Sequence, residues 1–584
     1  MKVLFFSPHA GIWVHAFPEA LIAESLMQAG HDIVYVTCNG QFRNYCVPMI
    51  AHGLKPDSDS IEKERICRIC KANKSIIRGE FAFKGYDLDS ALDESDFAQI
   101  EGHLKYATSE NFLDIVVDGV EVGRAALGTY LLTFKKSSLD FDEEDWRVFL
   151  IELTNTLYAF YASRKILRRE RPDRVVVYSS GYSVNLVVCH VAASLGIAHY
   201  YMNAGSNITD RLQKVVLARG HSLQKRLLTY WPAFRSKPCA EKTMRYATDH
   251  FIQVLQGRSG FVYSSARIGE SVNVREKFGV LPTQKILLAA MSSYDELFAA
   301  EATGLFPSNY ETPFPDQMSW LRTLLRWVAD RPELFLIIRV HPREFPNKRE
   351  SVKSEHARRL ERELRSLPQN AAVNWPADGL SLYDLAEVAS VCLNAWSTVG
   401  KEMSLLGIPT VIYSPDLVFY PEDLNYVGTT SDEYLQAIER ALDGGWSIEK
   451  TRLTYRWLAL EDYFSRLDIS DSFRRSENEI PSLLARVIGR IRRSIDPTWQ
   501  QQADCRRRAP KLGVSSLVNK IVSGGKYSLL DIVGPDDFES VSESEERTFL
   551  KSELRRLAKA LYVDFDQPGS PGTLKSNFQS FLRN

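Results

Sequence analysis

The segment from Leu334 to Pro415 decides the fold of this 584-residue chain. It opens with LFLIIRVHPRE (Leu334–Glu344), an apolar run that ends on a His-Pro pair, and it closes with VASVCLNAWSTVGKEMSLLGIPTVIYSPD (Val388–Asp416). The apolar, β-branched runs are too short for helices and alternate with helical patterns, which is typical of parallel strands buried on both faces. Ligands of such sheets bind beyond the carboxyl ends of the strands. We therefore expect the chemistry of this protein where these strands end.

The turn Trp396–Gly400 is the more informative of two strand ends in this segment. Ser397 and Thr398 are residue types that cap helices, and the helical pattern of Val399–Leu406 ends at Gly407. A helix start offers free backbone N–H groups and the positive end of a dipole to a phosphate. The turn therefore predicts a phosphate site, although an ordinary capped helix would show the same pattern.

Three more residues extend this prediction. Gly400 would let a ligand approach the backbone closely, and Glu402 would accept hydrogen bonds from ribose hydroxyls. His341 ends the preceding strand, where a histidine with purely structural contacts is the better explanation if it is taken alone. Together, the two strand ends favour a site for a nucleotide monophosphate or diphosphate.

These motifs resemble the nucleotide-sugar half of bacterial GT-B glycosyltransferases, above all the capsule and surface-polysaccharide biosynthesis group. The resemblance is carried by RVHPRE, by NWP-x-D-x-x-S-x-Y-D-L and by N-x-W-S-T-V-G-x-E-x-x-x-x-G-I-P, and it is specific from Lys285 to Pro415. It implies that His341 and Pro342 match the family's HP motif at the donor phosphate, and that Ser397 and Thr398 match its serine motif. The donor-site candidates are His341, Pro342, Arg339, Ser397, Thr398, Gly400, Glu402, Ser292 and Ser293.

The resemblance also implies an α/β fold of the GT-B type, with two Rossmann-like, doubly wound domains that face a cleft. We expect an acceptor domain at 1–275 with a helical insertion at about 81–169, and a nucleotide-sugar domain at 285–480. Residues 481–584 would form a crossover helix and a helical appendage. Gly279 and Pro282 punctuate the polar linker between the two domains.

Composition agrees with a large soluble enzyme. The chain is 45% hydrophobic and 25% charged, ordinary globular values, and its length predicts two or three domains. A net charge of -1 argues against nucleic-acid binding. Because the sequence shows no membrane-spanning run and no signal peptide, and because its eight cysteines fit a reducing compartment, we expect a cytoplasmic protein. The basic, amphipathic Ser482–Ile495 is either a contact to the inner face of the membrane or a crossover helix.

The N-terminus reads as a βαβ unit of the kind that an acceptor domain needs. Apolar runs predict strands at Lys2–Ser7 and His31–Thr37, with an amphipathic helix at Phe17–Ala29 between them. The loop after the first strand carries His9 and His15.

Sugar transfer with inversion requires a base that takes the proton of the acceptor hydroxyl. We predict His15 as this base and Glu19 as its orienting partner or substitute, because a spacing of four places both on one helix face. Asp295, after the strand Lys285–Ala290, is an alternative base. Polar surface residues at a helix start would give the same pattern.

Two further groups of residues are candidates for binding. Gly205 and Ser206 follow the strand His199–Met202 and are predicted to contact the acceptor. Four cysteines lie within 33 positions, and the last two form a Cys-x-x-Cys pair; they are Cys38, Cys46, Cys67 and Cys70. Four thiolates would complete a structural zinc site, although free thiols and redox chemistry fit the same spacing.

The sequence thus predicts a GT-B glycosyltransferase that transfers a sugar from a nucleotide-sugar donor to a capsule or O-antigen type glycan, or to its lipid-linked form. Because a histidine and a helix start can neutralise the departing phosphate, we expect no catalytic metal and no required cofactor. The alternatives are a CDP-polyol phosphotransferase of the same fold, a nucleotide-sugar epimerase, and a non-catalytic glycan-binding partner.

Overall fold

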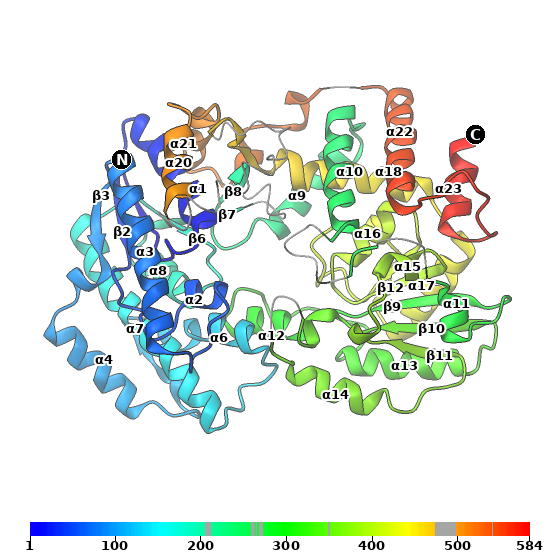
Figure 1. The fold of residues 1–584 in the computed structure, drawn as a ribbon, viewed down its shortest axis with the longest axis horizontal. Coiled ribbons are helices and arrows are strands. Elements are labelled where there is room, and N and C mark those ends of the chain that lie inside the picture. Colours follow the sequence, from blue (N-terminus) through cyan, green and yellow to red (C-terminus); the bar gives the residue numbers. More distant parts are fainter. Residues whose placement is uncertain are drawn as a thin grey trace.

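The computed structural model describes residues 1–204, 212–257, 263, 265–267, 272–347, 351–472, 498–539 and 541–583. The chain forms two α/β lobes that lie side by side, one built around each of two large sheets (Figure 1). Within the described residues, no helix combines the length and the apolar character needed to cross a membrane.

The first sheet belongs to the N-terminal lobe. Its parallel strands are β1 (Lys2–Phe6), β2 (Asp32–Thr37), β3 (Lys84–Asp87), β6 (Arg174–Tyr178) and β7 (Ala198–Ala204), in the order β3-β2-β1-β6-β7. The antiparallel strands β8 (Lys214–Arg219) and β14 (Leu467–Asp468) extend the sheet beyond β7. The order of the strands reverses between β1 and β6, which makes this pair the topological switch point.

The second sheet is parallel throughout. Its strands are β9 (Lys285–Ala290), β10 (Leu334–Arg339), β11 (Ala371–Asn374), β12 (Ala389–Asn394) and β13 (Thr410–Ile412), in the order β11-β10-β9-β12-β13. All six residues of β10 are buried, as its unbroken apolar sequence predicts for a strand covered on both faces. The switch point lies between β9 and β12.

Both lobes therefore use one strand order, and the predicted doubly wound α/β class is confirmed. Helices cover the sheets; the main ones are α1 (Trp13–Gln28), α8 (Ser183–Ser194), α13 (Gln317–Ala329), α16 (Val399–Leu405) and α17 (Ser431–Gly444). Helix α16 ends one residue before the predicted limit, and Gly407 follows with a φ of +77°. Helix α1 begins four residues before the predicted Phe17, so that His15 lies within it.

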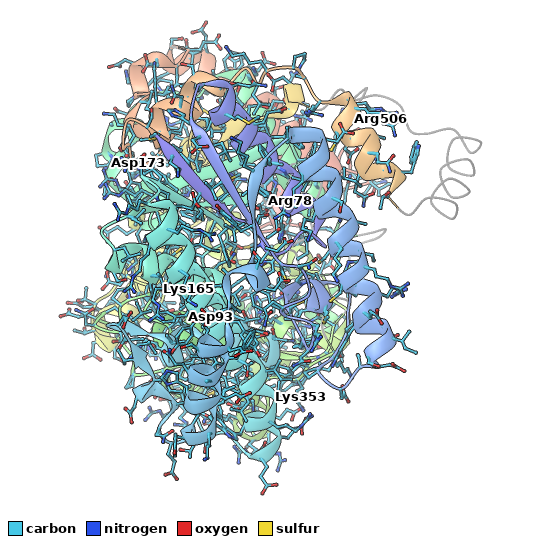
Figure 2. All side chains as sticks on the ribbon, turned by 90° about the vertical axis from the view of Figure 1, so that its left-hand side faces the viewer. Arg78, Asp93, Lys165, Asp173, Lys353 and Arg506 are labelled. Atoms are coloured by element: carbon cyan, nitrogen blue, oxygen red, sulfur yellow. The ribbon has the colours of Figure 1, made fainter. Side chains whose placement is uncertain are left out.

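The segment predicted as a helical insertion is mostly helical, but it also contains strands. Strands β4 (Val116–Val117) and β5 (Val120–Glu121) form a short antiparallel pair. Residues 84–87 form the edge strand β3, because they pair in parallel with β2. The helices that follow are α4 (Glu94–Tyr106), α5 (Val122–Ala125), α6 (Leu127–Phe134) and α7 (Glu143–Glu170). Lys165 of α7 donates a hydrogen bond of 2.5 Å to Asp93, the N-cap of α4, and both side chains are labelled in Figure 2.

The C-terminal region does not form a single appendage. Helix α20 (Trp499–Arg507) packs on α3 (Ser60–Phe81), and α21 (Ser515–Val522) packs on α1, so both belong to the N-terminal lobe. Helices α22 (Glu543–Leu561) and α23 (Leu574–Arg583) lie on the other lobe, where α22 packs on α10 (Glu241–Leu255) (Figure 1). The predicted crossover helix or membrane contact, Ser482–Ile495, lies outside the described residues.

The remaining helices of the described chain connect these parts. They are α2 (Val47–Ala51), α9 (Gln224–Arg235), α11 (Val274–Phe278), α12 (Tyr294–Ala302), α14 (Glu355–Glu363), α15 (Leu382–Ala386) and α18 (Ile448–Leu458). Helices α9 and α10 pack on α18, so residues before the predicted 275 boundary lie against the second lobe. This packing is tertiary, and no change of composition in the sequence marks it.

Candidate functional site

A cavity of about 90 Å³ lies at the switch point of the second sheet. Its walls come from the ends of β9, β10 and β12, from α15 and α16, and from Val254 and Tyr263. Six of the nine predicted donor-site residues line the cavity: His341, Pro342, Arg339, Ser397, Thr398 and Glu402. The two loops that the sequence analysis paired are thus neighbours.

His341 is held in a defined orientation at the end of β10. Its Nδ1 accepts a hydrogen bond of 3.3 Å from the backbone N–H of Arg343, which places the histidine at the start of a short 3-10 turn. Burial, together with the nearby cations of Arg343, Arg339 and Lys135, lowers the pKa of His341 to about 3. The imidazole is therefore neutral at neutral pH, and because Nδ1 accepts, Nε2 carries the proton and is a donor.

Arg339 brings a positive charge to the cavity. Its side chain is buried, and Nη1 donates to Asn374 Oδ1 at 2.5 Å and to the Leu380 carbonyl at 3.3 Å. Burial lowers the pKa of Arg339 to about 10, so the guanidinium stays charged at neutral pH. A buried cation beside hydroxyl and imidazole donors is a suitable environment for a phosphate.

The hydroxyl groups of the serine turn and Glu402 form a connected network. The Thr398 hydroxyl donates to Glu402 Oε1 at 3.0 Å, and the Tyr383 hydroxyl donates to Glu402 Oε2 at 2.9 Å. Ser397 donates to Asn394 Oδ1 at 2.8 Å. Because a carboxylate has about four acceptor positions, Glu402 keeps capacity for a further donor.

Three predicted donor-site residues serve the loops instead of the cavity. Ser292 accepts a hydrogen bond of 2.8 Å from the Trp396 backbone N–H, which ties the loop after β9 to the loop after β12. Ser293 donates to Asp295 at 2.7 Å. A Cβ on Gly400 would lie 2.0 Å from the Tyr420 hydroxyl, so packing against Tyr420, and not the approach of a ligand, requires this glycine.

Asp295, the alternative base, is also enclosed in a structural contact. Its Oδ2 accepts hydrogen bonds from Arg343 Nε at 3.1 Å and Nη2 at 2.8 Å, and both side chains are almost fully buried. Asp295 is not among the residues that line the cavity. A carboxylate oxygen that accepts two hydrogen bonds from a buried guanidinium is a poor proton acceptor, and this contact favours a structural role for Asp295 over the predicted role as a base.

The switch point of the first sheet carries the other catalytic candidates. His9, His15 and Glu19 line a cavity of about 10 Å³ together with Tyr178 and other residues at the ends of β1 and β6. His15 stacks on Tyr178 with a centroid distance of 4.1 Å and an interplanar angle of 18°. The predicted sharing of one helix face by His15 and Glu19 is therefore observed.

His9 and Glu19 lie beside His15, and both are buried in their neutral forms. Burial raises the pKa of the Glu19 carboxyl to about 8, and burial lowers the pKa of His9 to about 3. Glu19 Oε1 and His9 Nε2 are buried without a hydrogen-bond partner within the described structure. Such groups cost free energy in the folded state, a cost that is common at functional sites.

Helix α6 of the insertion connects the two switch points. A Cβ on its Gly128 would lie 2.8 Å from the Gly181 carbonyl, in the loop after β6, and 3.6 Å from Thr303 at the end of α12. The Lys135 ammonium, just after α6, donates to the Arg343 carbonyl at 2.5 Å. The insertion therefore touches the loops that lead from both cavities.

The four clustered cysteines lie beside the first switch point. All four are free thiols, and each is partly exposed. The Cys70 sulfur would lie 2.6 Å from a Cβ on Gly11, in the loop after β1, and burial raises the pKa of this thiol to about 12, with Cys38 and Cys67 adding to the effect. Their ligand atoms do not form one of the compact metal-binding groups of the described chain, so a zinc ion at this cluster stays a prediction.

Two predicted residues cannot be placed, and two residues of the cavity were not predicted. Gly205 and Ser206, the predicted acceptor residues, lie outside the described part of the chain. Tyr263 and Tyr383 line the second cavity without having been singled out. Tyr383 could have been predicted from the S-x-Y-D-L motif, which contains it. No motif contains Tyr263, which reaches the cavity only through the tertiary fold.

Comparison with known proteins gives distant structural likeness only. No protein-family model matches the chain, and no curated protein matches it by sequence. A UDP-GlcNAc 2-epimerase from Neisseria meningitidis, solved with UDP-GlcNAc, is 9% identical, with 78% of this chain and 96% of that chain covered and a TM-score of 0.26. A β-Kdo 2,4 transferase from Thermosulfurimonas dismutans is 13% identical, with 49% and 80% covered and a TM-score of 0.32.

A third solved structure, a spinosyn rhamnosyltransferase, is 12% identical to this chain. The match covers 79% of this chain and 96% of the rhamnosyltransferase chain, with a TM-score of 0.25. Likeness at this level does not carry a functional argument, so the function has to be argued from the two cavities.

Proposed function

We propose that the protein is a glycosyltransferase that takes a sugar from a nucleotide-sugar donor and transfers it to a surface polysaccharide. One observation carries this proposal: an imidazole, a buried guanidinium and two hydroxyls line a single cavity at a topological switch point. This is the position where doubly wound sheets bind nucleotides. The donor groups all suit a phosphate, and Glu402 suits the hydroxyls of a ribose.

The chemistry needed on the donor side is stabilisation of the departing nucleotide. Negative charge develops on the diphosphate as the bond to the sugar breaks. The His341 Nε2–H and the Arg339 guanidinium are donors for that charge before the reaction begins. The hydroxyls of Ser397 and Thr398 become donors to the phosphate when they turn away from Asn394 and Glu402. A volume of about 90 Å³ suits a phosphate group and not a whole nucleotide, so the base and the sugar extend beyond this cavity.

On the acceptor side we assign the proton transfer to His15. Glu19 is protonated at neutral pH because burial raises its pKa to about 8, so it is a hydrogen-bond donor that orients a neighbour and not the base itself. Tyr178 fixes the plane of the His15 ring by stacking. Both switch-point loops contact α6, and closure of the lobes about this contact would bring donor and acceptor together.

Thermal-shift measurements with UDP, GDP, CDP and CMP test the donor site. A ligand present at 100 times its Kd stabilises the native state by about 2.7 kcal/mol, so at least one nucleotide raises Tm clearly. The variants His341→Ala and Ser397→Ala lose most of that shift. His356→Ala is the matched control, because His356 is a buried histidine of the same lobe that stacks on Tyr294 outside the cavity. No shift with any nucleotide, or an equal shift in His341→Ala, would contradict the proposal.

Turnover separates an enzyme from a binding protein. Release of nucleotide from UDP-, GDP- and CMP-sugars is measured with and without added surface polysaccharide. We expect one donor to release nucleotide in a polysaccharide-dependent way. His15→Ala then abolishes release but keeps the nucleotide-induced rise in Tm. Nucleotide binding without any release would indicate the non-catalytic alternative.

A further inference from the structure

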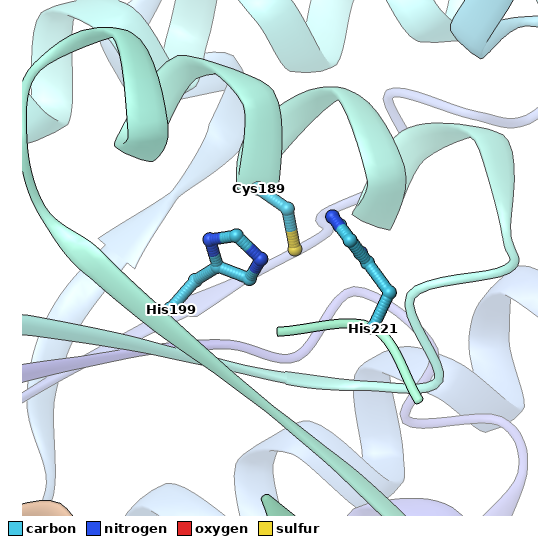
Figure 3. Close-up of side chains that lie close together, drawn as sticks. All are labelled: Cys189, His199 and His221. Carbon is cyan, nitrogen blue, oxygen red and sulfur yellow. The ribbon is translucent and has the colours of Figure 1, made fainter. Parts of the chain in front are cut away.

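One cysteine and two histidines from three separate elements converge in the N-terminal lobe. Cys189 lies on α8, His199 is the second residue of β7, and His221 follows the end of β8 by two residues (Figure 3). One ligand atom of each lies within 4.8 Å of the others. The cluster sits where β7 begins, away from the carboxyl ends of the parallel strands that form the proposed catalytic site.

Two ring nitrogens of this cluster lack a hydrogen-bond partner in the described structure. His199 Nε2 and His221 Nδ1 are buried without a hydrogen bond, and Cys189 is fully buried. The centroids of the His199 and His221 rings lie 4.6 Å apart, and the interplanar angle is 43°. Two buried ring nitrogens left without partners beside a thiol each carry a desolvation cost, and a shared ligand would offset it.

We propose that Cys189, His199 and His221 bind a Zn²⁺ ion through the cysteine sulfur, His199 Nε2 and His221 Nδ1. Thiolate and imidazole are the ligands that zinc prefers, and His₂Cys sets occur in its tetrahedral sites. Tetrahedral bonds of the usual zinc lengths place ligand atoms on the order of 3.5 Å apart, so no two ligand atoms approach each other by more than roughly 1.3 Å on binding. The bound thiol loses its proton to solvent as the metal–sulfur bond forms.

The fourth position and the entry route are both visible nearby. The centroids of the His190 and His221 rings lie 6.0 Å apart. The His190 imidazole or a water molecule is therefore the fourth ligand of the tetrahedron. A surface cavity of about 310 Å³ is lined by His199, Arg219 and Gly220 and opens beside the cluster. A metal ion in solution reaches the site through this cavity.

The position of the cluster gives the metal a structural role. Strand β8 runs antiparallel between β7 and the two-residue strand β14 in a sheet that is otherwise parallel, and His221 lies in the loop that follows β8. The Gly220 N–H donates to the His199 carbonyl at 3.0 Å, a backbone hydrogen bond between the loop after β8 and the start of β7. A metal bridge from Cys189 fastens the start of β7 and the loop after β8 to α8, so loss of the metal lowers stability and leaves the chemistry at His341 and His15 untouched.

The test uses the full-length protein, treated with a chelator and then titrated with Zn²⁺ or Co²⁺. We expect one equivalent of tightly bound metal, a rise in Tm on binding, and a thiolate-to-cobalt charge-transfer band with Co²⁺. Cys189→Ser abolishes that band. His221→Ala weakens Zn²⁺ binding by more than the 10- to 100-fold that is typical of losing an outer hydrogen-bond partner.

Two controls keep the result specific. Cys505→Ser changes another fully buried cysteine, on α20, and keeps the band and the affinity. The double variant Cys67→Ser/Cys70→Ser removes the other cysteine pair and also keeps one equivalent at this site. If Cys189→Ser does not fold, the wild-type cobalt spectrum and His221→Ala still decide the question. Absence of metal binding in the wild type, or a cobalt band lost only in the Cys67/Cys70 variant, would overturn the proposal.

Discussion

Arg343 and Asp295 form an ion pair of 2.8 Å between Nη2 and Oδ2 that is almost completely removed from solvent. Arg343 follows the His-Pro pair after β10, and Asp295 follows β9, so the pair fixes two neighbouring strand-end loops to each other. Arg343 also donates to the Leu132 carbonyl in α6 at 2.7 Å. One guanidinium thus joins the His341 loop, the loop after β9 and the insertion.

Breaking this pair from one side should destabilise the protein strongly. Asp295→Asn leaves the buried guanidinium with only the half-exposed Glu296 carboxylate at 3.6 Å, and loss of a buried partner typically costs about 3 to 5 kcal/mol. The double variant Asp295→Asn/Arg343→Met removes both charges and should cost less than the sum of the single variants. Urea denaturation measures each value.

The control for this prediction is the exposed ion pair of Arg322 and Glu363. Arg322→Ala should change the unfolding midpoint little, because solvent already screens its charge. If Asp295→Asn kept wild-type stability and lost only turnover, Asp295 would be a catalytic group after all.

Glu402 should contribute to affinity through the ribose of the nucleotide. Tyr383 and Thr398 orient its carboxylate, and a hydrogen bond to a charged acceptor contributes about 1.5 to 3 kcal/mol. Glu402→Gln should therefore weaken the best nucleotide by roughly tenfold or more. Calorimetric titration with that nucleotide and with its 2′,3′-dideoxy analogue measures the effect.

The dideoxy analogue is the internal control for Glu402. The wild type should bind it about as weakly as Glu402→Gln binds the natural nucleotide, and the variant should hardly distinguish the two ligands. An equal loss for both ligands in the variant would place Glu402 away from the ribose.

Glu19 should make stability depend on pH. Burial raises its folded-state pKa to about 8, from an ordinary value of 4.5. The unfolded chain therefore loses this proton first as the pH rises, so the contribution to stability is complete below about pH 4.5 and is lost by about pH 8. The slope is at most about 1.4 kcal/mol per pH unit for one group.

The variant Glu19→Gln removes this titration. The difference in unfolding free energy between about pH 5 and about pH 9 should become smaller in Glu19→Gln than in the wild type. Glu110→Gln, at an exposed position, should keep the wild-type difference. A Glu19→Gln profile parallel to that of the wild type would show that Glu19 ionises normally in the folded protein.

Gly400 should tolerate no side chain. A Cβ there would meet the Tyr420 hydroxyl at 2.0 Å and Asn394 Nδ2 at 2.8 Å, and overpacking of this kind costs about 1 to 3 kcal/mol. The double variant Gly400→Ala/Tyr420→Phe should lose less stability than the two single variants lose together, because the phenylalanine removes the clashing oxygen. Thermal unfolding measures this coupling.

Gly102 is the matched control for Gly400→Ala. It lies in helix α4 with no atom within 4 Å of a built Cβ, so Gly102→Ala should stabilise the protein by up to about 1 kcal/mol. A neutral Gly400→Ala would mean that Tyr420 moves away freely.

Several features of the fold follow from local sequence. Strands such as Leu334–Arg339 and Lys285–Ala290 were predictable because continuous apolar runs between helical patterns have few other solutions in a doubly wound fold. The end of α16 was predictable because Gly407 readily adopts the left-handed conformation found there. The loops at His341 and Ser397 were expected to meet because both follow the carboxyl ends of parallel strands, although β9 lies between β10 and β12 in the sheet.

Tertiary packing decided which of the neighbouring polar residues face the cavity. Ser292 and Ser397 both follow strands of the second sheet, yet Ser292 binds the Trp396 backbone while Ser397 lines the cavity. Local sequence does not encode this difference, because it depends on which loop packs against which.

The sequence by itself therefore determined the alternation of strands and helices, and with it the strand ends at which ligands can bind, since both arise from the periodicity of apolar residues. Only the tertiary structure decided the order of the strands, the pairing of Arg343 with Asp295, 48 positions away, and the meeting of Cys189, His199 and His221 between α8 and the start of β7. These contacts join residues far apart in the chain, and they form only when the sheets and helices pack.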